Sequence, residues 1–101
     1  MELQTLTFTI RGMTDRQAYI LVESLRLGIS EFDGIARHGR ATRLGQGTWA
    51  VTTGWESTGY LSAFRRSALY AKLVLSPNIT QFGESVERAE TAVAQHELVA
   101  A

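Results

Sequence analysis

The spacing of apolar side chains along the chain changes between a two-residue and a three-to-four-residue period. In residues 3–10, Leu6, Phe8 and Ile10 lie on one side and threonines occupy most of the other side. This alternation predicts a first β-strand.

A helical period follows this strand. Thr14 and Gln17 match a capping box, in which the Thr14 hydroxyl accepts from the backbone of Gln17 and the Gln17 side chain reaches back. The apolar stripe that follows consists of Ala18, Leu21, Val22 and Leu25. We expect a helix to about Leu27, with Gly28 as its C-terminal stop.

Two further strands are predicted at residues 35–44 and 48–55, because a short glycine-containing connection separates them, as in a hairpin. The second of these strands has two alternating sides. One carries Trp49, Val51 and Trp55, and the other carries Ala50, Thr52 and Gly54. Spacing alone leaves open which side meets the helices.

Ser57 is placed to cap a second helical region, with a possible break at Ser67. Pro77 ends this region, because proline disfavours helix at the residue before it. Residues 84–97 are rich in helix formers, but a three-stranded sheet would leave one edge bare. We therefore expect a last strand over 78–87 and a mobile or partner-packed tail over 88–101.

This order of elements, β-α-β-β-α-β, predicts a ferredoxin-like α+β fold, with an antiparallel sheet and both helices on one face. The chain of 101 residues forms a single domain in this interpretation, residues 1–101. One sheet face would remain uncovered, which favours a homodimer.

Composition excludes several classes of function. Ten basic and ten acidic residues give zero net charge, which disfavours binding to nucleic acid. There is no cysteine, no acidic and histidine cluster with metal-ligand spacing, and no apolar run of about 20 residues that could cross a membrane. The N-terminal residues lack a signal-peptide pattern, so we expect a cytoplasmic protein without a metal site.

We expect a pocket rim where the strand at 48–55 ends and the next helix starts. Trp55 could stack on a flat ligand and donate its indole N–H. His38 could act as a general base, and the guanidinium of Arg66 could stabilise a developing negative charge. Since Arg65 and Arg66 point about 100° apart, at most one of them can face a pocket. Further candidates for substrate contact are Tyr60, Phe64, Tyr70 and Trp49.

Each candidate also has a simpler structural explanation. Trp55 and the tyrosines could be ordinary packed aromatics, and His38 and the arginines could be solvated surface residues. No serine is placed by the sequence beside a histidine and an acid, so no hydrolytic triad is predicted.

The chain resembles the antibiotic biosynthesis monooxygenase-like family of the dimeric α+β barrel superfamily over about residues 3–87. The resemblance rests on the order of elements, on Phe32-Asp33-Gly34-Ile35 before the second strand, and on WESTGYLSAFRRSALY at residues 55–70. It implies a homodimer whose sheets face each other, with a pocket between sheet and helices in each protomer. Some members oxidise aromatic polyketides or quinols with dioxygen and no metal or flavin, and others degrade haem.

The chain also departs from the family pattern. Relatives often have a histidine after the alanine of the second helix, where this chain has Phe64 after Ala63, and another after the downstream serine, Ser67 here. This disfavours a haem-ligating role and leaves a pocket built from aromatics. We therefore expect a monooxygenase without a cofactor that acts on an aromatic or quinol-like small molecule. The alternative is a non-catalytic small-molecule-binding homodimer of the same fold.

Overall fold

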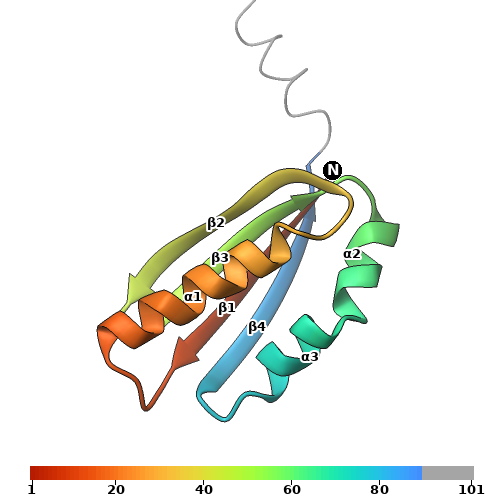
Figure 1. Ribbon diagram of the computed structural model, residues 1–101. Coiled ribbons are helices and arrows are strands. Elements are labelled where there is room, and N and C mark those ends of the chain that lie inside the picture. The colour runs from red at the N-terminus through yellow and green to blue at the C-terminus, as the bar shows by residue number, and fades with distance from the viewer. Residues whose placement is uncertain (90–101) are drawn as a thin grey trace, which may run out of the picture.

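The computed structural model describes residues 1–89, which form four strands and three helices (Figure 1). The strands are β1 (Glu2–Ile10), β2 (Ile35–Gly45), β3 (Thr48–Trp55) and β4 (Ile79–Arg88). The helices are α1 (Asp15–Ile29), α2 (Thr58–Arg65) and α3 (Ala68–Leu75). The ferredoxin-like arrangement expected from the sequence is confirmed, with the second helical region divided in two.

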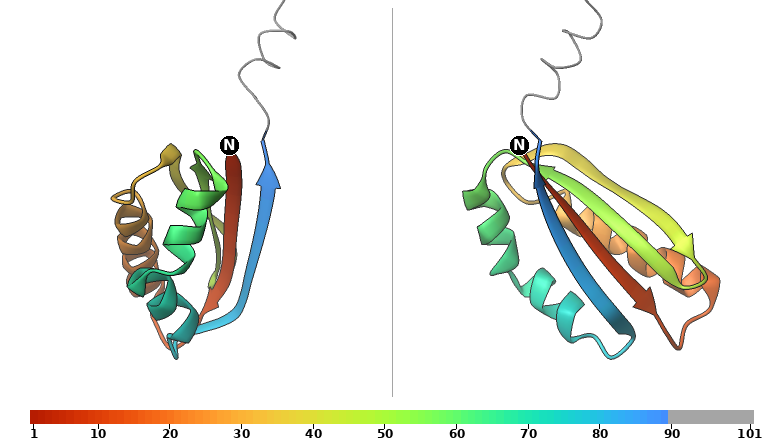
Figure 2. Two further views of the ribbon diagram at one scale, coloured as in Figure 1. Left: turned by 90° about the vertical axis from the view of Figure 1, so that its right-hand side faces the viewer. Right: turned by 180° about the vertical axis from the view of Figure 1, so that it is seen from behind.

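The four strands form one antiparallel sheet in the order β2-β3-β1-β4. All three helices pack on one face of this sheet, as the edge-on view in Figure 2 shows. The view from behind shows that no helix of residues 1–89 covers the opposite face (Figure 2). None of these helices is long and apolar enough to cross a membrane.

The register of β1 and β3 decides which side chains meet the helices. Leu6 pairs with Val51 and Phe8 pairs with Trp49, so these four side chains point to the same face. All four are at least nine-tenths buried in the core under the helices. The opposite face is lined by short polar side chains, including the hydroxyl pairs Thr5–Thr52 and Thr9–Thr48, each with an oxygen–oxygen distance of 3.1 Å.

The capping box of α1 is confirmed, but the predicted stop at Gly28 is wrong. The Gln17 backbone donates to the Thr14 hydroxyl, and the Thr14 backbone donates to the Gln17 side chain. The helix continues through Gly28 to Ile29. A Cβ atom at Gly28 would lie 3.2 Å from Cδ2 of Leu69, so the glycine lets α3 approach α1 closely.

The predicted break at Ser67 is confirmed. The Ser57 hydroxyl accepts from the Tyr60 backbone at the start of α2, and the Ser67 hydroxyl accepts from the Tyr70 backbone at the start of α3. A second N-cap in the middle of an apolar stretch begins a new helix with its own direction. The bend lets α2 and α3 follow the sheet on either side of Ser67 (Figure 1).

The last strand is present as predicted, within one residue at each end. The pairing of β1 with β4 is interrupted by a register shift between Thr7 and Thr9, opposite Gln81, which has a φ of 53°. The predicted tail at 88–101 lies, from residue 90 onward, outside the described residues.

The turn before β2 depends on Gly34. Its φ is +82°, in the left-handed region, and a Cβ atom there would lie 2.0 Å from Cγ of Tyr60. The carbonyl of Gly34 also accepts from the backbone N–H of Glu56, with a nitrogen–oxygen distance of 2.8 Å. Gly34 therefore lets the turn, the end of β3 and the start of α2 pack together.

We expect Gly34→Ala to lower the free energy of unfolding by at least about 2 kcal/mol, because the left-handed conformation is costly for alanine and the methyl group would displace Tyr60. The melting temperature would fall by roughly 8 °C or more in a domain of this size. Gly45→Ala is the matched control, because no atom lies within 4 Å of the added Cβ. Equal stability of the two variants would contradict this account.

Candidate functional site

A cavity of about 280 Å³ lies between α1 and α3, above the sheet. Phe8 of β1 and Ile79 of β4 belong to its lining, together with side chains from both helices. The residues from the helices and the segment after α3 are Leu21, Val22, Ser24, Leu25, Leu69, Lys72, Leu73 and Ser76. Most of this lining is apolar, which is typical of small-molecule pockets, although the volume is at the small end of their range.

A second, more open hollow of about 430 Å³ adjoins the cavity and shares Leu21 and Ser24 with it. Its other lining residues are Gly12, Met13, Gln17, Ile20 and Asn78. The second hollow is the more polar of the two, because Gln17 and Asn78 contribute to its lining.

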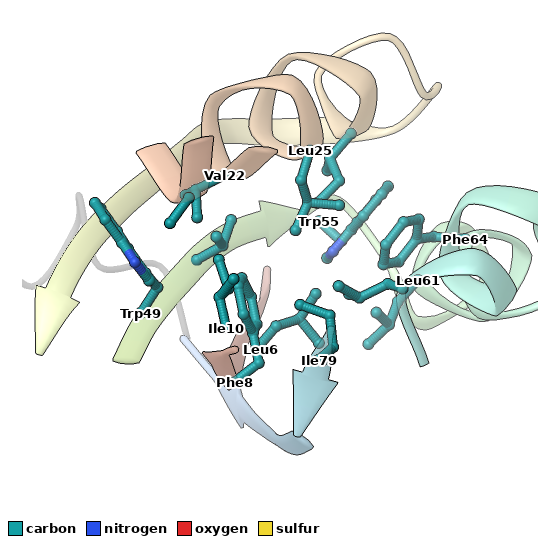
Figure 3. Packing of buried hydrophobic residues seen from close by; sticks show 14 residues of the cluster. Leu6, Phe8, Ile10, Val22, Leu25, Trp49, Trp55, Leu61, Phe64 and Ile79 are labelled. Atoms are coloured by element: carbon teal, nitrogen blue, oxygen red, sulfur yellow. The ribbon is translucent and has the colours of Figure 1, made fainter. Parts of the chain in front are cut away.

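Trp55 fills the space between α1 and α2. Its side chain is fully buried and lies between Leu25 and Phe64 in Figure 3. The rings of Trp55 and Phe64 are stacked, with centroids 5.2 Å apart and an interplanar angle of 25°. Phe32 packs edge-on against both rings. Because this end of the space between the helices is filled by aromatic rings, the cavity is confined to the α3 end.

A chain of hydrogen bonds connects Trp55 to β4. The indole Nε1–H of Trp55 donates to Oε1 of Gln4 over 3.1 Å, and Nε2 of Gln4 donates to Oε2 of Glu84 over 2.9 Å. Gln4 is 1% exposed and lies on the apolar side of β1, two residues before Leu6. The oxygen and the nitrogen of its side-chain amide are thus both paired inside the core, as a buried amide requires.

Glu84 is the centre of this network. Its carboxylate also accepts from the Tyr70 hydroxyl at 2.5 Å and forms an ion pair with Nη2 of Arg65 at 2.6 Å. Burial raises the pKa of Glu84, but hydrogen bonds from Tyr70, Gln4 and Arg65 outweigh it, and the net pKa is lowered. Burial, followed by the bond to Glu84, raises the pKa of Tyr70 to about 12.

The structure brings three of the residues predicted for substrate contact together. Trp55 stacks on Phe64, and Tyr70 packs edge-on against Phe64 with ring centroids 5.4 Å apart. Tyr60, 42% exposed, lies over Gly34 instead. Trp49 is at the opposite end of β3, where it contacts Tyr19 and lies under the guanidinium of Arg43. None of the five is among the cavity-lining residues in the described part of the chain.

The two residues predicted to be catalytic lie elsewhere. His38 is exposed on the edge strand β2, and Arg66 is the exposed C-cap of α2. Of the two adjacent arginines, Arg65 joins the aromatic cluster, through Glu84. Neither His38 nor Arg66 lines the cavity. Their catalytic roles stay predictions.

Gln4, Glu84 and the cavity-lining Lys72 were not predicted from the sequence. A signal was present for Gln4, because a polar residue in register with Leu6 and Phe8 indicates a polar group turned toward the core. No comparable pattern marked Glu84 or Lys72. Within residues 1–89, no group of three histidine or acidic side chains could hold a metal ion.

We expect Glu84→Gln to destabilise the protein most at neutral pH. The folded state holds the Glu84 carboxylate at a pKa below its ordinary value of 4.5, so the stability that this group contributes is present above that pH and is lost as the pH falls through the lowered value. The difference in free energy of unfolding between wild type and variant should therefore shrink below about pH 4.5. Urea unfolding at several pH values measures it.

Glu87→Gln is the control for the loss of one carboxylate, because Glu87 is exposed on the same strand. A difference between wild type and Glu84→Gln that stays constant from neutral to acidic pH would contradict the lowered pKa.

No family model matches the chain, and no curated protein matches it in sequence. Solved structures do match. SnoaB from Streptomyces nogalater, a cofactor-independent oxygenase, is 10% identical with a TM-score of 0.69, over 89% of this chain and 94% of that chain.

Two further structures match over a similar extent. An antibiotic biosynthesis monooxygenase is 10% identical with a TM-score of 0.70, over 89% of this chain and 99% of that chain. Rv0793 from Mycobacterium tuberculosis is 15% identical with a TM-score of 0.69, over 89% of this chain and 96% of that chain. At these identities the likeness shows the fold. The resemblance to antibiotic biosynthesis monooxygenases expected from the sequence is confirmed at that level.

Proposed function

We propose that the protein binds a small aromatic or quinol-like molecule in the cavity between α1 and α3 and oxidises it with dioxygen, without a bound cofactor. The cavity itself carries this proposal, because it is a small apolar space between helices and sheet. Support for the chemistry comes from the likeness in fold to SnoaB, a cofactor-independent oxygenase.

The composition of the lining favours a largely apolar ligand. Leu21 and Leu25 from α1 face the cavity together with Leu69 and Leu73 from α3, and Phe8 adds an aromatic ring from the sheet. A ligand that fills this space removes apolar surface from water on both sides, at roughly 25 cal/mol per Å². Ser24 and Ser76 supply hydroxyl groups for a ligand oxygen.

The proposed reaction consumes one dioxygen for each substrate molecule. One oxygen atom enters the ring or a ring methylene, which becomes a carbonyl, and the other leaves as water with two substrate hydrogens. The four electrons that reduce dioxygen come from the substrate carbon framework. No external reductant is needed, which makes electron-rich hydroxylated aromatics the appropriate class.

The second candidate is a non-catalytic protein that binds the same class of molecule. It is favoured by the composition of the lining, which contains no histidine, carboxylate or tyrosine among the described residues. A general base for substrate deprotonation would normally come from these types. The indole N–H of Trp55, a candidate donor to substrate, is already bonded to Gln4.

We also propose that the protein forms a homodimer through the uncovered sheet face. The support is that face itself, visible from behind in Figure 2, and the resemblance to a superfamily of dimeric barrels. The face carries threonines that pair across strands, such as Thr5 with Thr52, so the contact would be made by short side chains.

We expect Leu21→Trp to abolish both ligand binding and oxygen uptake. Leu21 is half-buried at the cavity, so a larger ring there would occupy the ligand's space at a cost of about 1–3 kcal/mol in stability. Oxygen uptake with a panel of dihydroxyaromatics and quinols, together with calorimetric titration of the same compounds, measures both effects.

Leu27→Trp is the matched control, because Leu27 is on the same helix but 55% exposed and does not line the cavity. Uptake that survives in Leu21→Trp would place the reaction elsewhere. Binding without any uptake in the wild type would favour the non-catalytic candidate.

For the dimer, we expect light scattering to give a mass near twice 11.1 kDa. Thr52→Arg on the uncovered face should shift the mass toward the monomer, because a long charged side chain replaces a short one in the proposed contact. The substitution Thr58→Arg, at the exposed start of α2, is the control. A wild-type protein that is monomeric at micromolar concentration would contradict the proposal.

A further inference from the structure

Lys72 is the single lysine of the chain, whose other nine basic residues are arginines. It is also the one charged side chain among the described residues that line the cavity. Lys72 is exposed overall while it borders an apolar space. A lysine in this situation lays its methylene stem along the apolar surface and keeps its ammonium group in water.

Lys72 is also available to bind a ligand. Arg26, Arg43 and Arg65 form ion pairs with carboxylates of the protein. Within residues 1–89, no carboxylate lies within ion-pair distance of Lys72. Lys72 lies in the last turn of α3, and no carboxylate of the described fold competes with a ligand for its positive charge.

We propose that the cavity selects organic monoanions, with the apolar body of the ligand inside it and a carboxylate or an ionised ring hydroxyl paired with Lys72 at its rim. This proposal rests on the proposed function and names the class of ligand that the same site prefers. Ser24 of α1 and Ser76 after α3 line the same cavity and can donate to the anionic oxygen.

The division of polarity within the site supports an amphipathic ligand. The floor is formed by Phe8 and Ile79, which are both at least nine-tenths buried, so a charge placed there would lose its hydration without compensation. At the rim an anionic group keeps part of its water and gains an ammonium partner. A neutral ligand of the same shape would gain only the apolar contact.

The test compares two probes of nearly equal shape, naphthalene carboxylate and naphthalene carboxamide, by calorimetric titration at pH 7 and low salt. We expect wild-type protein to bind the carboxylate about three- to tenfold more tightly than the amide, the range of a rim ion pair with added hydrogen bonds. Lys72→Met should remove this preference by weakening carboxylate binding, because the ammonium group is lost while an apolar stem is retained.

Two further variants separate the effect of Lys72 from that of net charge. Lys72→Arg should keep the preference, because it keeps the positive charge at the rim. Arg16→Met removes one positive charge from an exposed position of α1 that does not line the cavity, and it should leave the preference intact. Added salt should reduce the preference in every protein that shows it.

Equal binding of both probes to wild-type protein, or a preference that survives in Lys72→Met, would overturn the role of Lys72 and leave the proposed function standing. Loss of the preference in Arg16→Met as well would show a general charge effect and would also overturn it. Failure of both probes to bind wild-type protein would contradict the cavity as a ligand site, and with it the proposed function.

Discussion

The burial of Trp55 between α1 and α2 is the interaction on which the arrangement of the helices depends. An indole ring is large, and its N–H must find an acceptor when it is removed from water. Gln4 supplies that acceptor from the central strand, and the Phe64 ring covers the indole face. The end of β3, the first residues of β1 and the end of α2 are thereby held together at one point.

The cavity follows from the same arrangement. The aromatic rings fill the space between the helices at the α2 end, whereas the α3 end is lined by leucines that leave a volume of about 280 Å³. The approach of α3 to α1 is set by two local features, the N-cap at Ser67 and the lack of a side chain at Gly28. The structure thus places two different regions side by side. One is a cluster of packed aromatic rings, and the other is a cavity with a mostly apolar lining.

The separation of these two parts bears on function. Glu84, Tyr70 and Arg65 satisfy one another and Gln4, so their charges and hydroxyl group are engaged within the fold. Their surroundings favour the ionised carboxylate of Glu84 and the neutral phenol of Tyr70, so the pKa of Glu84 is lowered and that of Tyr70 is raised. This suits a structural network more than proton transfer near neutral pH. Chemistry in the cavity would instead depend on the ligand's own reactivity, with Lys72 as the charged group at its rim.

The sequence by itself determined the order and type of the elements, because periodicity, caps and turns are local properties: the capping box at Thr14, the hairpin and the break at Ser67 were all predicted. Tertiary structure alone decided that Trp49, Val51 and Trp55 face the helices, since a two-residue period defines two sides without saying which is covered. Tertiary structure also decided the role of Gly28, which does not end α1 but lets Leu69 of α3 pack closely against it. Gln4 and Glu84, 80 residues apart in sequence, meet only through the pairing of β1 with β4, which residue spacing does not encode.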